Sequence, residues 1–294
     1  MRLASALVDG ERRAAVLEGA DVFIAEDVTL EDAIAQRLDV RGCRGAWSDR
    51  TSVALDVPLR PPVVLCSGQN YHDHLDEKAT PVPEVPEFFL KAGQTVADLD
   101  APHEWDERVT TKLDYETELG VVIGRRARHV AAADALDHVL GLVTVHDLTA
   151  RERQVKFSPT GFLYLDVGPG KNFDGATRIA ESIVTLDEVG DPQALGLSTK
   201  VNGELRQSNT TANMIFSVAQ IIEYLSTLLT LEPGTVIATG TPGGTAWGQD
   251  RELGGTKLTP PDCVPGVYLA VGDRVVSRIE KVGELAFDVV AALT

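Results

Sequence analysis

The chain is poor in basic residues, in aromatic residues and in paired cysteines. Its 294 residues include 27 Lys and Arg against 44 Asp and Glu, which gives a formal net charge of -17 at pH 7. Nucleic acids and anionic membrane surfaces are bound by clustered Lys and Arg. No basic run is longer than the pairs Arg12-Arg13 and Arg125-Arg126. The composition therefore argues against both kinds of partner.

Long hydrophobic runs are missing too. No stretch approaches the roughly 18 apolar residues of a membrane-spanning helix, and the N-terminal MRLASALVDGERR carries charges where a signal peptide is apolar. Cys43, Cys66 and Cys263 are scattered, which favours neither a disulfide framework nor a thiolate metal site. With 44% hydrophobic, 24% charged and 5% aromatic residues, the chain is typical of globular proteins, and we expect a cytoplasmic one.

Motifs of several enzyme classes are absent. The sequence has no P-loop G-x-x-x-x-G-K-[ST], no Rossmann G-x-G-x-x-G and no G-x-S-x-G nucleophile elbow. It also has no repeat of about 20 to 50 residues. Phosphate-loop enzymes, dinucleotide-dependent dehydrogenases, serine hydrolases of the elbow type and repeat proteins therefore find no support.

The first 60 residues predict a small N-terminal α/β domain. Two apolar runs flank Asp9-Gly10, a dipeptide that tolerates positive φ in a tight turn, so a β-hairpin is expected there. The proline-rich stretch 55–62 cannot continue a helix and predicts a linker. We therefore expect two domains, residues 1–60 and residues 61–294.

Two helices are predicted from apolar residues at helical spacing. The first is short and begins at Thr29, which resembles a capping residue together with Asp32. The second spans about residues 213–229 and ends before Pro233-Gly234. The residues expected on the buried faces are Leu30, Ile34 and Leu38 in the first helix and Ile215, Val218, Ile222, Leu225 and Leu229 in the second.

From Val63 onward the pattern is dominated by short apolar runs. VVLC, FFL, LGVVIG, LGLVTVH, TVIATG and DRVVSRIE are of strand length, and many are bounded by Gly, Pro or Asp. The expected fold class is therefore a β-rich α+β protein.

Three carboxylates stand where simple solvation is unfavourable. Glu116 and Glu118 are two residues apart in LDYETELGVVIG and would share one face of a strand that runs into an apolar segment. Asp147 follows the apolar run LGLVTV, at the expected end of another strand. Neighbouring like charges need a cation there, and three carboxylate oxygens suit Mg²⁺ or Mn²⁺. Solvated glutamates on an edge strand and a helix-capping aspartate are the alternative.

Polar residues after Asp147 are candidates for binding an anionic substrate. Arg151 and Gln154 follow it at i+4 and i+7, which places the three on one face of a helical turn. Lys171 lies between glycines in GPGKNFDG, where the backbone can approach a ligand closely. A surface ion pair between Arg151 and Asp147, and a solvated loop lysine, are the alternatives.

Two further segments carry chemistry. In GQNYHDHLDEK, His74 and Glu77 are three residues apart, so the carboxylate could orient the imidazole as a general base. A mobile surface loop is one alternative, and a transition-metal site with His72 and His74 is another, although no further histidine follows at ligand spacing. VIATGTPGG predicts a tight turn at Thr241 that can present hydroxyl and N–H groups to an anion, or else a plain β-turn.

Seven segments, taken in order, resemble the fumarylacetoacetate hydrolase superfamily. They are GQNYHDHLDE, PEFFLK, LDYETELGVVIG, VTVHDLTARERQ, GKNFD, VNGELRQ and IATGTPGG. The resemblance covers about Val63 to the C-terminus and is strongest to the group of 2-oxo acid hydrolases, hydratases and isomerases. It implies a mixed β-roll catalytic domain with a Mg²⁺ or Mn²⁺ site, behind a small N-terminal domain, in a homodimer.

The resemblance also implies roles for individual residues. The metal carboxylates would be Glu116, Glu118 and Asp147, the catalytic residues His74, Glu77 and Lys171, and the substrate-binding residues Tyr71, Arg151, Gln154 and Thr241. The chain departs from the family pattern after GKNFD and in residues 243–267, a long insertion in which Trp247 could line a pocket.

The expected activity is metal-dependent hydrolysis of a carbon–carbon bond. An acylpyruvate or another 2,4-dioxo acid would give pyruvate, or a related 2-oxo acid, and a carboxylate, with His74 taking a proton from the attacking water. Decarboxylation of oxaloacetate, or hydration, isomerisation or lyase chemistry on a 2-oxo acid, could use the same site. A non-catalytic dimer that binds a small acid is the alternative from another class of protein.

Overall fold

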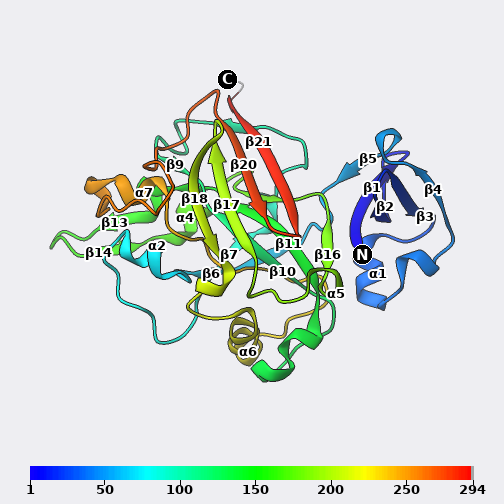
Figure 1. Cartoon of the computed structure of the whole chain (residues 1–294). Helices are drawn as coiled ribbons and strands as arrows, with labels where there is room; N and C mark the ends of the chain where they lie inside the picture. The colour runs from blue at the N-terminus through cyan, green and yellow to red at the C-terminus, as the bar shows by residue number, and fades with distance from the viewer. Residues whose placement is uncertain (293–294) are drawn as a thin grey trace.

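The computed structural model describes residues 1–292, with a small N-terminal unit beside a larger β-rich body (Figure 1). The predicted hairpin is present, and Asp9 and Gly10 have φ values of 51° and 81°, as a two-residue turn of this kind requires. The elements of the N-terminal unit are β1 (Arg2–Val8), β2 (Glu11–Glu18), β3 (Asp21–Ala25), α1 (Leu30–Gln36), β4 (Gly45–Asp49) and β5 (Ala54–Asp56).

Helix α1 begins as predicted but ends at Gln36, before the last apolar residue of the predicted helical pattern, Leu38. The Thr29 side chain accepts a hydrogen bond from a backbone N–H of the first turn at 3.1 Å, which confirms the cap. The helix ends because Arg37 adopts the left-handed conformation, with φ of 57°. Leu38 therefore lies outside the helix and is 42% exposed. Its predicted place on the buried face with Leu30 and Ile34 is wrong.

A long mixed sheet connects the two units. Its strand order is β4-β3-β2-β1-β16-β11-β10-β19-β6-β7, and Arg2 in β1 pairs with Val184 in β16. The N-terminal sheet thus continues into the body, and the division near residue 60 stays a prediction. The strands that the body adds are β6 (Val63–Gly68), β7 (Glu87–Ala92), β10 (Thr117–Ile123), β11 (Val139–Asp147), β15 (Thr177–Ile179), β16 (Ile183–Thr185) and β19 (Val236–Ala238).

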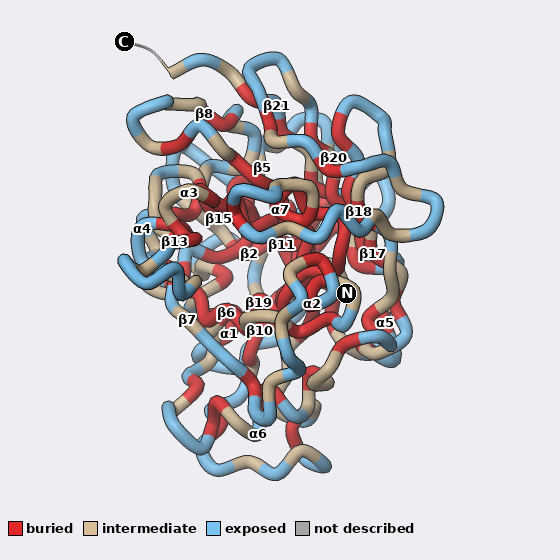
Figure 2. Tube along the Cα trace, turned by 90° about the vertical axis from the view of Figure 1, so that its left-hand side faces the viewer, coloured by how far each residue is buried: buried red, intermediate tan, exposed pale blue. Residues whose placement is uncertain are grey.

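A second sheet of order β18-β17-β20-β21-β8 belongs to the same body. Its strands are β8 (His103–Trp105), β17 (Gly196–Val201), β18 (Glu204–Thr210), β20 (Arg274–Ile279) and β21 (Gly283–Ala291). Buried polar contacts join the sheets, since Ser277 Oγ lies 2.7 Å from both Thr117 Oγ1 and His146 Nδ1. Figure 2 shows the buried segments gathered around β10, β11 and β19. The β-rich α+β class is confirmed.

Helix α6 (Val218–Leu228) is shorter than the predicted 213–229. Ser217 caps it through the backbone N–H of Gln220, and the two residues before the cap donate their N–H groups to Asn70 at 2.8 Å each. This contact with a distant segment holds residues 215–216 outside the helix. Ile215 and Leu229 are therefore not part of it, and the buried face consists of Val218, Ile221, Ile222 and Leu225.

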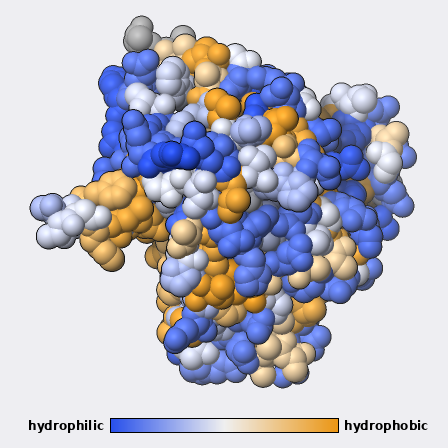
Figure 3. All heavy atoms as spheres, turned by 60° about the vertical axis from the view of Figure 1, so that its left-hand side comes forward, coloured by the Kyte–Doolittle hydropathy of each residue, from blue (hydrophilic) through white to orange (hydrophobic). Residues whose placement is uncertain are grey.

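The remaining helices and strands are short. They are α2 (His72–Asp76), β9 (Leu113–Asp114), β12 (Thr149–Ala150), α3 (Arg151–Gln154), β13 (Val155–Phe157), β14 (Leu163–Leu165), α4 (Val167–Lys171), α5 (Leu186–Val189) and α7 (Ala246–Gln249). The hairpin of β13 and β14 projects from the body (Figure 1), and Figure 3 shows apolar side chains on this projection. Within residues 1–292, no helix is long and apolar enough to cross a membrane.

Candidate active site

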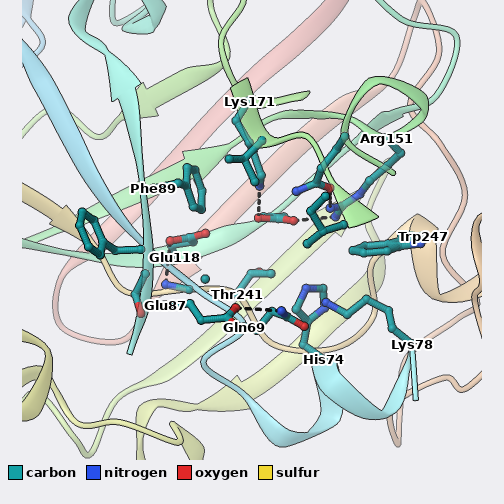
Figure 4. A pocket seen from close by; sticks show the side chains of 18 of the residues that line it. Gln69, His74, Lys78, Glu87, Phe89, Glu118, Arg151, Lys171, Thr241 and Trp247 are labelled. Atoms are coloured by element: carbon teal, nitrogen blue, oxygen red, sulfur yellow. Dashed lines mark hydrogen bonds and ion pairs between the residues drawn. The ribbon is translucent and has the colours of Figure 1, made fainter. Parts of the chain in front are cut away.

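The predicted site residues gather around a cavity of about 570 Å³ (Figure 4). The cavity lies at the edge of the main sheet where β6, β11 and β19 end and β10 begins, because β10 runs antiparallel to β11 and β19. Seven predicted residues line it: His74, Glu116, Glu118, Arg151, Gln154, Lys171 and Thr241.

Glu116, Glu118 and Asp147 form a buried carboxylate cluster. One oxygen of each lies within 4.8 Å of the others. Glu116 precedes β10 rather than lying in it, which differs from the prediction. Its carbonyl nevertheless accepts the backbone N–H of Asp147 at 2.9 Å, which keeps it beside β11. This backbone hydrogen bond between distant segments thus holds Glu116 next to Asp147, so the three carboxylates lie close together although Glu116 is outside the strand.

Two buried lysines compensate part of this charge. Lys171 Nζ donates to Glu116 at 2.7 Å and to Asp147 at 2.8 Å. Lys91, which sequence reasoning missed, donates to the other oxygen of Asp147 and to the Ala176 carbonyl. Lys91 stands only at the end of the apolar run FFLK, so its partner could not be inferred from its neighbours.

Glu118 has no cationic partner within ion-pair distance among the described residues. Burial, together with the like charges of Asp147 and Glu116, raises the pKa of Glu118 well above its usual range. Three hard oxygen donors, one of which has no cation paired with it in the described chain, fit a divalent cation such as Mg²⁺ or Mn²⁺. Among residues 1–292 this is the only group of three or more potential ligands of this kind, and it contains neither His72 nor His74.

The turn after β19 completes the carboxylate end of the cavity. Gly240 donates its N–H to Glu118 at 2.8 Å. Its φ is +92°, and a Cβ there would stand 2.9 Å from the Cβ of Asn70, so only glycine fits. Thr241 donates its hydroxyl to the Thr117 carbonyl at 3.0 Å. The predicted N–H donor to an anion is present, and its acceptor is the Glu118 carboxylate.

His74 and Glu77 form a buried dyad on α2 and just beyond it. His74 Nδ1 lies 3.0 Å from Glu77 Oε2, and Glu77 also accepts the Gly244 N–H at 2.5 Å and the Thr245 hydroxyl at 3.0 Å. Burial lowers the pKa of His74 well below its usual value, so the ring is neutral at pH 7. Burial raises the pKa of Glu77 to about 8, although the hydrogen bonds from Gly244 and Thr245 act to lower it. The dyad leaves Nε2 of His74 for a ligand.

Arg151 is bound to the protein through every guanidinium nitrogen. It donates to Asp114 at 2.7 Å, to Gln154 at 2.8 Å and to Glu116 at 2.6 Å. The alternative interpretation, a surface ion pair between Arg151 and Asp147, is therefore wrong, because Arg151 is buried and pairs with Asp114 and Glu116. Asp114 was missed, although it precedes Glu116 by two residues; it also accepts the N–H groups of Ala246 and Trp247 at 2.9 Å each.

The insertion at residues 243–267 closes one side of the cavity, and Trp247 lines it as expected. The Trp247 indole N–H donates to the Leu253 carbonyl at 2.8 Å, which fixes the ring. Lys78 Nζ lies 4.5 Å from the ring centroid, within range of a cation–π contact. Figure 4 shows Lys78, His74 and Trp247 at one end of the cavity and Glu118 at the other.

Lys78 is the third residue that sequence reasoning missed, after Lys91 and Asp114. It lines the cavity, is half-buried and forms no ion pair with any described residue. Burial and the nearby Arg151 guanidinium lower the pKa of Lys78 to about 7. Lys78 directly follows Glu77 in the sequence, and this position beside a predicted catalytic residue could have indicated that it lies in the site.

Tyr71 differs from the other predicted substrate-binding residues. Its side chain is fully buried in a hydrophobic cluster that includes Leu65 and Met214. It is not among the residues that line the cavity. Tyr71 therefore has no part in the proposal below.

Comparisons with known proteins identify the family. The family described as Fumarylacetoacetate (FAA) hydrolase C-terminal matches residues 63–290. Oxaloacetate tautomerase YisK of Bacillus subtilis is 37% identical over 240 residues, covering 80% of this chain and 73% of that protein. The structure of fumarylacetoacetate hydrolase from Exiguobacterium antarcticum superposes with a TM-score of 0.78, at 32% identity over 99% of this chain and 100% of that chain. Maleylpyruvate hydrolase from Sphingobium, solved with manganese(II) and pyruvate, gives 0.75 at 26% identity over 100% of both chains.

Proposed function

The chain belongs to the fumarylacetoacetate hydrolase family, and on that premise we propose that it catalyses keto–enol tautomerisation of oxaloacetate or a closely related dicarboxylic 2-oxo acid. Lys78 carries the proposal, because it forms no ion pair with a described residue and lies at the opposite end of the cavity from Glu118. A substrate with a carboxylate at each end suits a cavity with cationic groups at both ends. The likeness to an oxaloacetate tautomerase supports this choice.

Mg²⁺ or Mn²⁺ would be held by Glu116, Glu118 and Asp147. When bound, the cation would supply electrostatic stabilisation of negative charge that develops next to the 2-oxo group. The buried donor set, in which Glu118 has no ion-pair partner among the described residues, supports this assignment. Lys91 and Lys171 hold the carboxylates in place through their hydrogen bonds.

His74 is the residue that would move the proton. Its Nδ1 is held by Glu77, so Nε2 accepts a proton from carbon 3 of the keto form, and the electron pair of the broken C–H bond forms the C2=C3 bond. Return of the proton to the 2-oxo oxygen completes the enol. Burial disfavours charge on both members of the dyad, so a proton taken up by His74 would be readily given back to the substrate.

Lys78 would bind the distal carboxylate beside the Trp247 ring. Arg151 was expected to bind a substrate carboxylate, but its three nitrogens already donate to protein acceptors. It therefore acts as a positioning residue for Glu116. Lys78 remains as the cation of the cavity whose ammonium is not engaged by a carboxylate of the described residues.

Hydrolysis of an acylpyruvate, which the sequence alone put first, is the second candidate. The His74–Glu77 hydrogen bond of 3.0 Å favours it, because the same dyad could take a proton from an attacking water. The likeness to a maleylpyruvate hydrolase adds support. The homodimer and the cytoplasmic location also remain proposals, and analytical ultracentrifugation of the purified protein tests the first.

A direct assay separates the candidates. The enzyme with Mn²⁺ or Mg²⁺ is mixed with freshly dissolved enol-oxaloacetate, and loss of the enol absorbance is followed while pyruvate is measured separately. We expect fast loss of the enol without pyruvate, and a loss of about a hundredfold or more in His74→Ala. Pyruvate release from acylpyruvates with no effect on the enol would favour hydrolysis, and pyruvate from oxaloacetate would indicate decarboxylation. No turnover of either substrate would support a binding protein.

A further inference from the structure

A second cavity, of about 450 Å³, lies beside β8 and β15. It shares no lining residue with the active-site cavity. Its wall includes Arg178 of β15, His103 and Trp105 of β8, Phe173 and Gly175. None of these residues has a part in the proposed reaction.

Arg178 is a buried cation without a carboxylate partner. Arg178 is 2% exposed, and its Nη1 donates to the Ala101 carbonyl at 2.6 Å. Nε and Nη2 are buried and have no acceptor among the described residues. The guanidinium carbon lies 4.4 Å from the centroid of the Phe287 ring. Burial lowers the pKa of Arg178 to about 10, so the group is still charged at pH 7. A buried charge with unused donors is costly unless an anion meets it.

Other donors face the same space. His103 Nδ1 and Trp105 Nε1 are also buried and have no partner among residues 1–292. A Cβ on Gly175 would stand 3.4 Å from His103 Nδ1 and 3.8 Å from Arg178 Nη2. The glycine therefore leaves free the volume that lies next to both donors.

The acidic residues of this cavity do not occupy Arg178. Asp98 is paired with Arg60 at 2.5 Å and Asp106 with Arg108 at 2.7 Å. Glu104 and Asp174 also line the cavity, and both are exposed. No carboxylate of the described chain lies within ion-pair distance of the Arg178 guanidinium. The acidic groups thus stand at the rim, while the cation lies at the buried wall.

We propose that this cavity is a second ligand site, which binds a small oxyanion of the carboxylate or phosphate class through Arg178 and His103. A planar guanidinium whose Nε and Nη2 both lack an acceptor among the described residues presents N–H groups that match the oxygens of either anion. A cavity of about 450 Å³ holds a small organic acid or a phosphate compound. The Trp105 indole N–H supplies a further donor.

Calorimetric titration with inorganic phosphate and with acetate, at constant ionic strength in chloride, tests the proposal. Binding of one of them is expected in the wild type and, unchanged, in Lys78→Met, which removes the active-site cation that has no ion-pair partner among the described residues. Arg178→Gln should weaken that binding by about tenfold or more. The anion that binds more tightly identifies the ligand chemistry.

A second variant covers the case in which Arg178→Gln does not fold. His103→Phe keeps an aromatic ring against Phe173, whose centroid lies 6.0 Å away, but removes Nδ1, so the dissociation constant should rise several-fold. Absence of binding by both anions, unchanged binding in Arg178→Gln or His103→Phe, or loss of binding in Lys78→Met would overturn the proposal. These measurements follow no turnover, so their failure leaves the proposed activity untouched.

Discussion

Each of the two cavities contains a buried arginine, and the two arginines differ in their partners. Arg151 donates from all three nitrogens to Asp114, Gln154 and Glu116. Arg178 donates to one backbone carbonyl and meets no carboxylate among the described residues. The first is part of the framework that positions the carboxylate cluster, whereas the second keeps donors for a ligand. The role of a buried cation thus depends on how many acceptors the fold already supplies.

The same contrast separates two lysines of the active site. Lys171 is buried and donates to Glu116 and Asp147. Lys78 is half-buried and forms no ion pair with a described residue, and its ammonium lies 4.5 Å from the centroid of the Trp247 ring. Paired cations are therefore expected to hold protein groups in place, and unpaired ones to bind ligands. Four measurements test this distinction.

The largest effect is expected at Glu118, in the carboxylate cluster of the active site. Glu118→Ala should lower kcat/KM by about a thousandfold or more, because a bound divalent cation contributes several kcal/mol of charge stabilisation. Steady-state kinetics with and without added Mn²⁺ measure this effect. Glu107→Gln, in an exposed glutamate, is the control. Full activity of Glu118→Ala without added metal would contradict the metal assignment.

The two arginines are compared directly by replacing each with methionine. Arg151→Met leaves Asp114 buried without its cation, so the free energy of unfolding should fall by about 3–5 kcal/mol. Arg178→Met removes a charge that has no carboxylate partner among the described residues. The free energy of unfolding should therefore change by about 1 kcal/mol or less, or increase. Urea denaturation followed by circular dichroism measures both. If both variants lost the same free energy of unfolding, pairing with a carboxylate would not explain a difference between the two arginines.

Lys78→Met should raise the KM for oxaloacetate by about tenfold, since one charge-assisted contact is lost, and should leave kcat nearly unchanged. A 2-oxo acid without a second carboxylate should show no such increase. Lys200→Met, on the exposed side of β17, is the matched control. A similar rise in KM for both substrates would mean that Lys78 does not recognise the distal carboxylate.

The smallest effect concerns pH. The pKa of Lys78 is lowered to about 7, so the ammonium is charged below this pH and neutral above it. The KM for oxaloacetate should therefore rise several-fold between about pH 6 and about pH 8. In Lys78→Met the KM should be flat over this range. A pH dependence that persists in the variant would assign it to another group.

Short-range preferences explain the parts of the fold that were predictable. Asp9-Gly10 formed its turn and Thr29 its cap because each depends on a few adjacent backbone groups. Helix α6 started later than its apolar pattern because Asn70 binds the N–H groups before Ser217. The competing hydrogen bonds come from a segment 146 residues away, so no local pattern could reveal them.

The sequence by itself determined which reactive side chains are available and that they occur in the order typical of one enzyme family. Glu116 and Glu118 could be chosen because alternate residues of a strand share a face, and Asp147 because it follows an apolar run of strand length. Only the tertiary structure decided which charges are paired. Lys91 lies 56 residues before its partner Asp147, while Lys78 and Arg178 have none within residues 1–292. Pairing depends on distances between segments that the fold brings together, and these distances separate the framework cations from those left free to bind ligands.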